Sequence, residues 1–272
     1  MKKLLFIAFF IITSLTFCLS AYAEENSKVN MDKALLDSGM LKISYKADTN
    51  KIIKVVIEKG DKKYIYNLRS DGVEEKYALQ MGNGSYKVTV YENLEGSNYM
   101  PIFTDTVDLN VTNDKLVYLN SIQNINWDLK MNAIKKAATL VKGLKSDKQK
   151  VDVIYKYVVA NYAYDFEKYK NLNKLPNPYI PVIDKTYAER KGICYDYSSL
   201  FASMLRSVNI PVKLQMGYSK NVTEYHAWNE VYMSSQKKWI VVDTTYDAQM
   251  KKAKRSYSMS KGLNLYTFTK TY

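Results

Sequence analysis

Residues 41–119 form short segments in which hydrophobic and polar residues alternate. A period of two is typical of β-strands that bury one face. Turn-forming residues, among them Gly60-Asp61 and Gly82-Asn83-Gly84, separate the segments at intervals of about ten residues. Evenly spaced strands with no helix between them predict a small antiparallel β-sandwich of the immunoglobulin-like kind. The expected strands are 42–45, 52–58, 63–68, 85–91, 104–111 and 116–119.

The hydrophobic period changes after residue 127, which predicts a β-sandwich domain over 24–127 and a second domain over 128–272. Hydrophobic residues recur at helical spacing over 134–144 and again over 151–159, and Ser146 is placed to cap the second helix. Residues 165–184 contain three prolines and many polar residues, which predicts a surface loop. Helices that follow a run of antiparallel strands place the chain in the α+β class.

A further helix is expected to begin close to residue 194, immediately after Gly192, and to run to about residue 208. This places Cys194 at the helix N-terminus, whereas an ordinary buried cysteine would lie further along, on the hydrophobic stripe. The unsatisfied N–H groups and the helix dipole at that end favour thiolate over thiol and can stabilise an oxyanion. The stripe that predicts the helix consists of Leu200, Phe201, Met204 and Leu205.

Two more strands are expected over 225–232 and 238–243. His226, the only histidine of the chain, lies in the first of them, and after a turn at 234–237 the second ends at Asp243. Antiparallel pairing of these strands would bring Asp243 close to His226. A thiolate, an imidazole that shares its proton and a carboxylate that fixes the tautomer are the groups that a cysteine acyl-transfer site needs. Cys194, His226 and Asp243 are therefore the candidate catalytic residues.

Each of these three residues also has a structural interpretation. A lone histidine is more often structural than catalytic, an aspartate at a strand end usually forms a turn, and a lone cysteine is usually inert packing. All three interpretations would have to hold together. A single site accounts at once for the helix start and the two strand positions, and it is the interpretation that we prefer.

Residues 1–23 have the pattern of a secretory signal peptide. Two lysines precede an apolar run from Leu4 to Leu19, and Ala21 and Ala23 supply the small residues of a cleavage site. Acidic residues follow at once, which favours cleavage over retention as a membrane anchor. No later segment is apolar enough to span a bilayer, so we expect a secreted, extracellular protein, free or associated with the cell wall.

Cleavage after Ala23 would leave one cysteine in the mature chain. Cys18 would leave with the leader, and the bulky Phe17 before it fits a lipidated cysteine poorly. No intramolecular disulfide is then possible. Cys194 is either an accidental buried thiol or a thiol kept for its chemistry.

Composition and charge restrict the classes of protein that the chain can belong to. With 47% hydrophobic and 25% charged residues over 272 positions, the chain is neither disordered, collagen-like nor disulfide-rich. Its net charge of +13, or +11 without the leader, suits an anionic cell-wall polymer or membrane surface, and equally a role in solubility alone. The 25 tyrosines occur without the aromatic and glycine signature of RNA-binding sheets, so we expect no nucleic-acid partner.

Six separated motifs occur in a fixed order along the second domain. They are Gly192-Ile-Cys194, Leu200-Phe201 with Leu205-Arg206, Asn209-Ile-Pro211, Gly217-Tyr218, His226-Ala-Trp228-Asn-Glu230, and Trp239 with Asp243-Thr-Thr245. In this order and spacing, residues 128–250 resemble the transglutaminase-like superfamily. The resemblance implies a papain-like fold in which Cys194 is the nucleophile, His226 the base and Asp243 its orienting partner.

The resemblance also has gaps. Many members have Asp-Pro-Thr where this chain has Asp243-Thr244-Thr245, a change that should leave the carboxylate in place. Relatives supply a second oxyanion donor from a residue upstream of the nucleophile, and here Tyr164 and Tyr187 are the two candidates. Nothing in the sequence resembles the calcium-binding loops of animal transglutaminases, and no Asp, Glu or His cluster has metal-ligand spacing. We therefore expect no metal or organic cofactor.

The superfamily does not fix the reaction. An acyl-enzyme resolved by a lysine amine gives an isopeptide crosslink, water gives deamidation, and attack on a backbone or cell-wall peptide amide gives proteolysis. We expect a secreted cysteine protease or acyltransferase that acts on peptide, protein or cell-wall peptide amides at the cell surface. The alternative is a non-catalytic cell-surface protein, in which the basic β-sandwich binds an anionic polymer and the papain-like domain is a scaffold.

Overall fold

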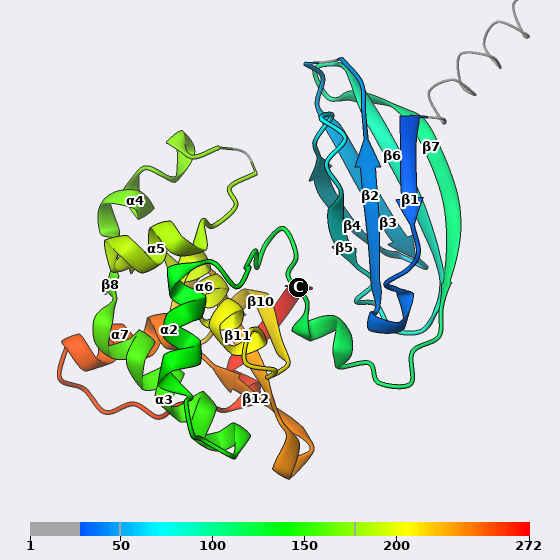
Figure 1. The fold of residues 1–272 in the computed structure, drawn as a ribbon. Coiled ribbons are helices and arrows are strands. Elements are labelled where there is room, and N and C mark those ends of the chain that lie inside the picture. The colour runs from blue at the N-terminus through cyan, green and yellow to red at the C-terminus, as the bar shows by residue number, and fades with distance from the viewer. Residues whose placement is uncertain (1–27, 49, 177) are drawn as a thin grey trace, which may run out of the picture. The chain divides into compact units, whose positions relative to one another are not determined.

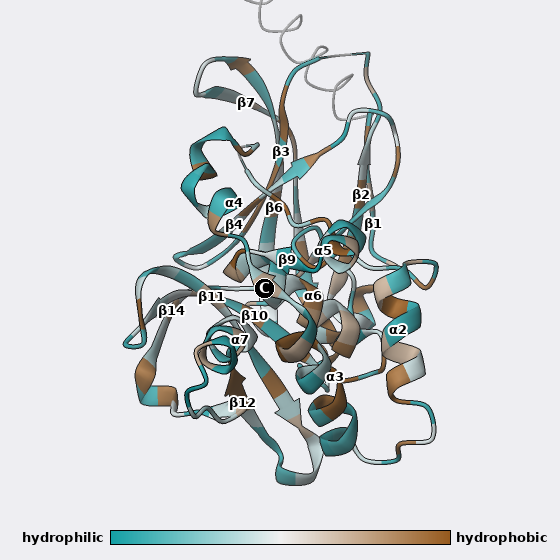
Figure 2. Ribbon diagram, turned by 90° about the vertical axis from the view of Figure 1, so that its left-hand side faces the viewer, coloured by the Kyte–Doolittle hydropathy of each residue, from teal (hydrophilic) through white to brown (hydrophobic). Residues whose placement is uncertain are grey.

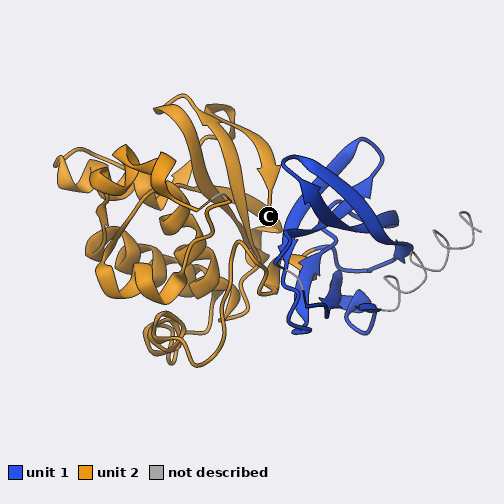
Figure 3. Cartoon of the chain, turned by 90° about the horizontal axis from the view of Figure 1, so that it is seen from above, with its two compact units in different colours: residues 1–114 blue, residues 115–272 orange. Residues whose placement is uncertain are grey.

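A computed structural model describes residues 28–48, 50–176 and 178–272. The leader expected over 1–23 lies outside the described residues. The chain divides into two compact units, 1–114 and 115–272 (Figure 3). The domain boundary near residue 128, which the hydrophobic period indicates, stays a prediction. Within the described part of the chain, no helix is both long and apolar enough to cross a membrane.

The N-terminal unit consists of antiparallel strands (Figure 1). They are β1 (Val29–Asp32), β2 (Met40–Tyr45), β3 (Ile53–Lys59), β4 (Lys62–Leu68), β5 (Glu75–Ala78), β6 (Gly84–Glu95) and β7 (Asn98–Leu109), with the short 3-10 helix η1 (Leu36–Ser38). One sheet has the strand order β1-β2-β5 and the other β4-β3-β6-β7. In β3 the side chains of Ile53, Val55 and Ile57 are buried and the residues between them are half-buried, as the alternating pattern predicts. An immunoglobulin-like arrangement of the two sheets stays a prediction.

The strand expected over 116–119 is wrong, because these residues form the 3-10 helix η2 (Leu116–Leu119). This segment has no alternation of hydrophobic and polar residues, so its period could not separate strand from helix. In the structure Val117 is buried, and the ring of Tyr118 packs edge-on against Trp239 with 5.5 Å between centroids. Packing within the C-terminal unit therefore takes the place of a partner strand.

The C-terminal unit combines helices with a five-stranded sheet, so the protein is a mixed α/β protein with antiparallel sheets. The helices are α2 (Asn132–Leu140), α3 (Asp147–Asn161), α4 (Phe166–Lys170), α5 (Ile183–Glu189), α6 (Cys194–Arg206) and α7 (Thr244–Lys252), with the 3-10 helices η3 (Leu172–Lys174), η4 (Ser234–Gln236) and η5 (Leu263–Leu265). Both α2 and α3 carry hydrophobic and hydrophilic residues, as amphipathic helices do (Figure 2). Ser146 caps α3 as expected, because its Oγ accepts the N–H of Gln149 at 3.3 Å.

The sheet of this unit has the order β13-β12-β11-β10-β14. Its strands are β10 (Val212–Ser219), β11 (Val222–Met233), β12 (Lys238–Val242), β13 (Ser260–Lys261) and β14 (Tyr266–Thr271), and β8 (Ala163–Tyr164) pairs separately with β9 (Lys191–Gly192). Helix α6 packs against β10 and β11, and every residue from 196 to 206 is buried. The N-terminus of α6 and the strand that carries His226 are thus fixed by the core of the unit.

Gly217 allows two strands to approach closely beside His226. It pairs with His226 in β11 and with Phe268 in β14. A Cβ atom at position 217 would lie 2.1 Å from the carbonyl oxygen of Thr267. This distance is too short for any residue with a side chain. The glycine therefore permits β14 to pair with β10, and that pairing places Tyr266 next to the histidine strand.

Candidate active site

Cys194 is the first residue of α6, as the sequence predicts. The carboxylate of Asp196, at the third helical position, accepts the N–H of Ile193 at 2.9 Å and so caps the helix. Gly192 leaves room for this carboxylate, because a Cβ there would lie 2.5 Å from the Cβ of Asp196. The sulfur of Cys194 thus lies at a helix N-terminus, where backbone N–H groups have no partner within the helix.

His226 and Asp243 are brought together by two paired strands. β11 and β12 are antiparallel, with Asn229 opposite Val242, and Asp243 follows directly after β12. The Nε2 atom of His226 lies 2.8 Å from Oδ2 of Asp243. Both side chains are buried, with exposed fractions of 4% and 0%. A proton held on Nε2 by the carboxylate leaves Nδ1 of the imidazole available to Cys194.

The electrostatics of this pair favour a charged imidazole. Burial alone lowers the pKa of His226, but the negative charge and hydrogen bond of Asp243, together with the Cys194 side chain, raise the pKa to about 10. Burial alone likewise raises the pKa of Asp243, but the positive charge of His226 and three hydrogen bonds hold the pKa below its usual value. An imidazolium beside the sulfur stabilises a thiolate, which is the reactive form of cysteine.

Asp243 accepts hydrogen bonds from two further groups. Its Oδ1 accepts the backbone N–H of Tyr246 at 3.0 Å, which makes Asp243 the N-cap of α7. Its Oδ2 accepts the hydroxyl of Tyr266 in β14 at 3.0 Å. Sequence reasoning missed Tyr266, and no motif could have indicated it, since the contact depends on how β14 joins the sheet.

Trp228 packs behind the catalytic candidates rather than in front of them. Its ring stacks on His226 with 6.2 Å between centroids and contacts Tyr266 at 5.0 Å. Only 1% of Trp228 is exposed, and it forms a hydrophobic cluster with Val241 and Tyr266. This packing limits rotation of the imidazole, and Trp228 is a core residue.

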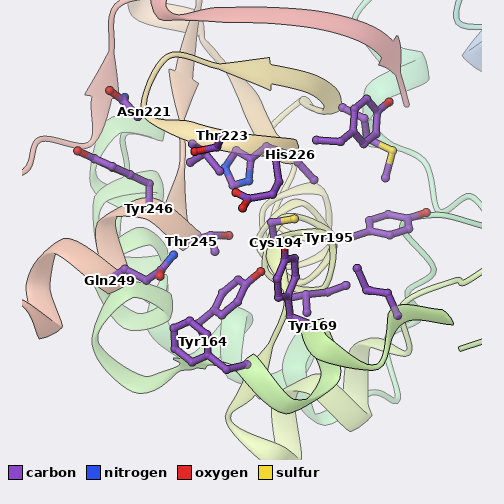
Figure 4. A pocket seen from close by; sticks show the side chains of 18 of the residues that line it. Tyr164, Tyr169, Cys194, Tyr195, Asn221, Thr223, His226, Thr245, Tyr246 and Gln249 are labelled. Carbon is purple, nitrogen blue, oxygen red and sulfur yellow. The ribbon is translucent and has the colours of Figure 1, made fainter. Parts of the chain in front are cut away.

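Cys194 and His226 line a cavity of about 460 Å³ (Figure 4). Figure 4 shows the two side chains facing each other, with Tyr164 and Thr245 close by. The wall is mainly apolar and aromatic. It is formed by Tyr164, Phe166, Tyr169, Leu172, Ile193, Tyr195, Met216, Asn221, Val222, Thr223, Glu224, Tyr225, Ala227, Thr245, Tyr246, Gln249 and Met250.

The structure separates the two tyrosines considered as oxyanion donors. Tyr164, in β8, lines the cavity, and burial and the nearby Cys194 raise the pKa of its phenol, so the hydroxyl stays protonated and can donate. Tyr187 lies outside the cavity wall, and its ring packs 4.3 Å from the guanidinium carbon of Arg190. Tyr164 is therefore the tyrosine placed beside the sulfur.

The surface loop expected over 165–184 is wrong in part, because the segment contains α4, η3 and the start of α5. A partly buried ion pair ties α4 to the start of α6. Nζ of Lys168 lies 2.6 Å from Oδ2 of Asp196, and the hydroxyl of Tyr179 donates to Oδ1 of the same carboxylate at 2.5 Å. Asp196 has no exposed surface, whereas the side chain of Lys168 is 22% exposed. Because Phe166 and Tyr169 belong to α4, as Lys168 does, this network also positions one wall of the cavity.

The described residues contain no group of three or more His, Cys, Asp or Glu side chains that could hold a metal ion. The expectation that the protein uses no metal or organic cofactor stays a prediction.

The sequence of the C-terminal unit matches a known family. Residues 134–244 match the core domain of the transglutaminase-like superfamily. The chain is also 25% identical over 178 residues to the UPF0252 protein MJ1282 of Methanocaldococcus jannaschii, a match that covers 61% of this chain. The chain spans about half the length of that relative, of which 46% is covered.

Several solved structures are similar in part. A protein of Cytophaga hutchinsonii, provisionally named a cysteine protease, has a TM-score of 0.41 at 16% identity and covers 76% of this chain and 71% of its own. LapG of Legionella pneumophila has a TM-score of 0.27 at 13% identity and covers 42% of this chain and 74% of its own. Red sea bream transglutaminase has a TM-score of 0.30 at 10% identity and covers 76% of this chain and 48% of its own.

Proposed function

We propose that the protein is a cysteine acyl-transfer enzyme for peptide or protein amides, on the premise that residues 134–244 match the core domain of the transglutaminase-like superfamily. One observation carries the proposal. The only histidine of the chain lies between the carboxylate of Asp243, at 2.8 Å, and the side chain of Cys194, at the wall of a cavity. Nucleophilic catalysis by cysteine needs these three groups, with the imidazole between the carboxylate and the thiol.

In the first half-reaction the thiolate of Cys194 attacks the carbonyl carbon of the amide. The carbonyl oxygen becomes an oxyanion, which the backbone N–H of Cys194 and the hydroxyl of Tyr164 stabilise. The C–N bond then breaks, the proton on Nδ1 of His226 goes to the leaving nitrogen, and a thioester remains on Cys194. Asp243 keeps the imidazole oriented throughout and stabilises its charged form.

In the second half-reaction an acceptor attacks the thioester. His226, now neutral, takes a proton from water or from an amine, and the sulfur leaves as thiolate. Water gives hydrolysis of a peptide amide or deamidation of a side chain, and an amine gives a crosslink. Cysteine protease or amidase activity on surface proteins or cell-wall peptides is the outcome that we propose first.

We place this activity outside the cell. The leader pattern of residues 1–23 supports export, and the basic charge supports association with the cell wall. In this proposal the N-terminal unit is an immunoglobulin-like module that holds the catalytic unit near an anionic polymer. A non-catalytic binding protein with the same fold is the second candidate, and the net charge of +13 is the observation that favours it.

The proposal is tested with hydroxylamine, which converts a thioester on Cys194 into a hydroxamate. The protein is incubated with a mixture of peptides from cell-wall and surface-protein digests, and hydroxamates and new termini are detected by mass spectrometry. Wild-type protein should produce them, and Cys194→Ala should produce none, because the nucleophile is gone. Products that persist in Cys194→Ala would contradict the proposal. A wild-type protein that forms no acyl product would favour the binding protein instead.

A further inference from the structure

The charge of the cavity wall differs from that of the rest of the protein. The chain carries 40 lysines and arginines, yet none of them lines the cavity beside Cys194. Apart from His226, the charged side chain in that wall is Glu224, in the exposed first part of β11. A basic protein therefore has a negative charge at the mouth of its candidate active site.

Among the carboxylates of the C-terminal unit, that of Glu224 has neither an ion pair nor a hydrogen bond in the described structure. The nearest comparison is Glu230, six residues along the same strand, whose carboxylate lies 3.4 Å from Nζ of Lys213. Three lysines of the unit form ion pairs with other carboxylates, since Lys168 pairs with Asp196, Lys191 with Asp165 and Lys261 with Asp247. The remaining acidic residues of the unit accept hydrogen bonds or form ion pairs, namely Asp128, Asp147, Asp152, Glu167, Asp184, Glu189 and Asp243.

The wall next to Glu224 is suited to a cation as well. Tyrosine side chains from five elements line the same cavity, and the π faces of such rings attract ammonium groups. The charge of Glu224 reaches Tyr164, beside the reactive sulfur, since it helps to raise the pKa of that phenol. The rings concerned are Tyr164, Tyr169, Tyr195, Tyr225 and Tyr246.

We propose that Glu224 makes the enzyme selective for substrates that carry a protonated amine on a side chain close to the reacting amide. The inference rests on the proposed function and adds a substrate class to it. The ammonium group of a lysine-type side chain binds between the Glu224 carboxylate and the tyrosine rings, and it is not the nitrogen that leaves or attacks. A neutral side chain loses this attraction, and an acidic one is repelled.

The test uses two peptidyl chloromethyl ketones that differ only in one side chain next to the ketone, lysine in one and glutamine in the other. Each alkylates Cys194 with loss of chloride, and mass spectrometry of the Cys194 peptide gives the rate. Wild-type protein should react about fivefold faster with the lysine probe, a preference that weakens as salt is added. Glu224→Gln should lose most of this preference, because only the tyrosine rings then attract the ammonium group, and Glu224→Lys should prefer the glutamine probe.

A matched control separates a local effect from a change in overall charge. Glu189→Gln removes one negative charge from an exposed position on α5, outside the cavity wall, and should keep the wild-type preference. Equal rates for both probes in wild-type protein, or a preference as large in Glu224→Gln as in wild type, would overturn the inference. Iodoacetamide, which has no side chain to select, reports separately on the thiol. If iodoacetamide reacted no faster with Cys194 than with an ordinary thiol, the proposed function itself would be contradicted.

Discussion

His226 lies between the carboxylate of Asp243 and the side chain of Cys194, and the protonation state of its imidazole determines whether Cys194 is activated. The hydrogen bond to Asp243 and the stacked ring of Trp228 fix the imidazole in one orientation. Tyr266 and the N–H of Tyr246 occupy the other acceptor positions of Asp243, so the carboxylate stays ionised although it is fully buried. These contacts preorganise the pair before any substrate binds.

Tyr164→Phe tests whether the phenol stabilises the oxyanion. Removing the hydroxyl should lower kcat by about 100-fold, because oxyanion donors act mainly in the transition state. The KM and the rate of alkylation by iodoacetamide should change little, since neither depends on the oxyanion. Tyr187→Phe, outside the cavity wall, is the control and should behave as wild type. Equal kcat values for wild type and Tyr164→Phe would show that another group serves as the donor.

The sequence indicated the candidate catalytic residues that lie together in the structure, but not all of their partners. Cys194, His226 and Asp243 could be found because each lies at a position that local pattern defines, namely a helix start, a strand and a strand end. Tyr266 contacts Asp243 across 23 residues of chain, and Tyr164 reaches the cavity from a two-residue strand. Neither position carries a local pattern, so only tertiary structure could select Tyr164 over Tyr187.

At the scale of elements, the first turn of α6 is the part on which the site depends most. Its N-cap region is held by Asp196, which accepts the N–H of Ile193 and the side chains of Lys168 and Tyr179. The same carboxylate thus shapes the turn that carries Cys194 and anchors α4 and the loop that follows it. Movement of α4 would move the aromatic side chains of Phe166 and Tyr169 in the cavity wall.

Asp196→Ala should lower the free energy of unfolding by about 2–3 kcal/mol. The change removes a helix cap and leaves the partly buried Lys168 without its counterion. Chemical denaturation followed by circular dichroism measures the loss. Asp152→Ala breaks the more exposed pair with Lys148 within α3 and should cost less than about 0.5 kcal/mol. Similar losses in both variants would mean that the Asp196 network is not a structural support.

A clear hydrophobic period led to a prediction in several elements but not in all, since β10 alternates as β3 does and was not predicted. The strands with alternating burial, β3 and β6, and the capped helix α3 agree with their patterns. The four-residue strands β1 and β5 are too short to show a period, and they gain their stability by pairing with β2. η2 is uniformly hydrophobic, so its sequence does not distinguish strand from helix. Packing of Tyr118 on Trp239 determines its conformation instead.

At the scale of the whole molecule, the excess of positive charge has no counterpart in the candidate site. The net charge is +13, while the cavity wall carries one unpaired carboxylate. For the surface charge we propose an anionic polymer of the cell wall as the partner. Such a role is compatible with catalysis, because the polymer would hold the enzyme close to its substrate.

Binding to an anionic polymer should depend on salt and not on the thiol. We expect the protein and its Cys194→Ala variant to be retained equally on immobilised polyglutamate at low salt. Both should elute before about 1 M NaCl, where the screening length falls to about 3 Å. Elution profiles over a salt gradient give the measurement. Retention that does not change with salt would exclude charge as the basis of binding.

The alkylation of Cys194 by iodoacetamide as a function of pH tests the central claim, that Cys194 and His226 form an activated pair. The pKa of His226 is raised to about 10, so the imidazolium is present at every lower pH and should stabilise the thiolate there. We predict rapid alkylation already at about pH 6, below the range of an ordinary thiol. In His226→Gln, which keeps a hydrogen-bond donor for Asp243, this reaction at low pH should be lost. A thiol that reacts only above about pH 8.5, with or without His226, would contradict the account.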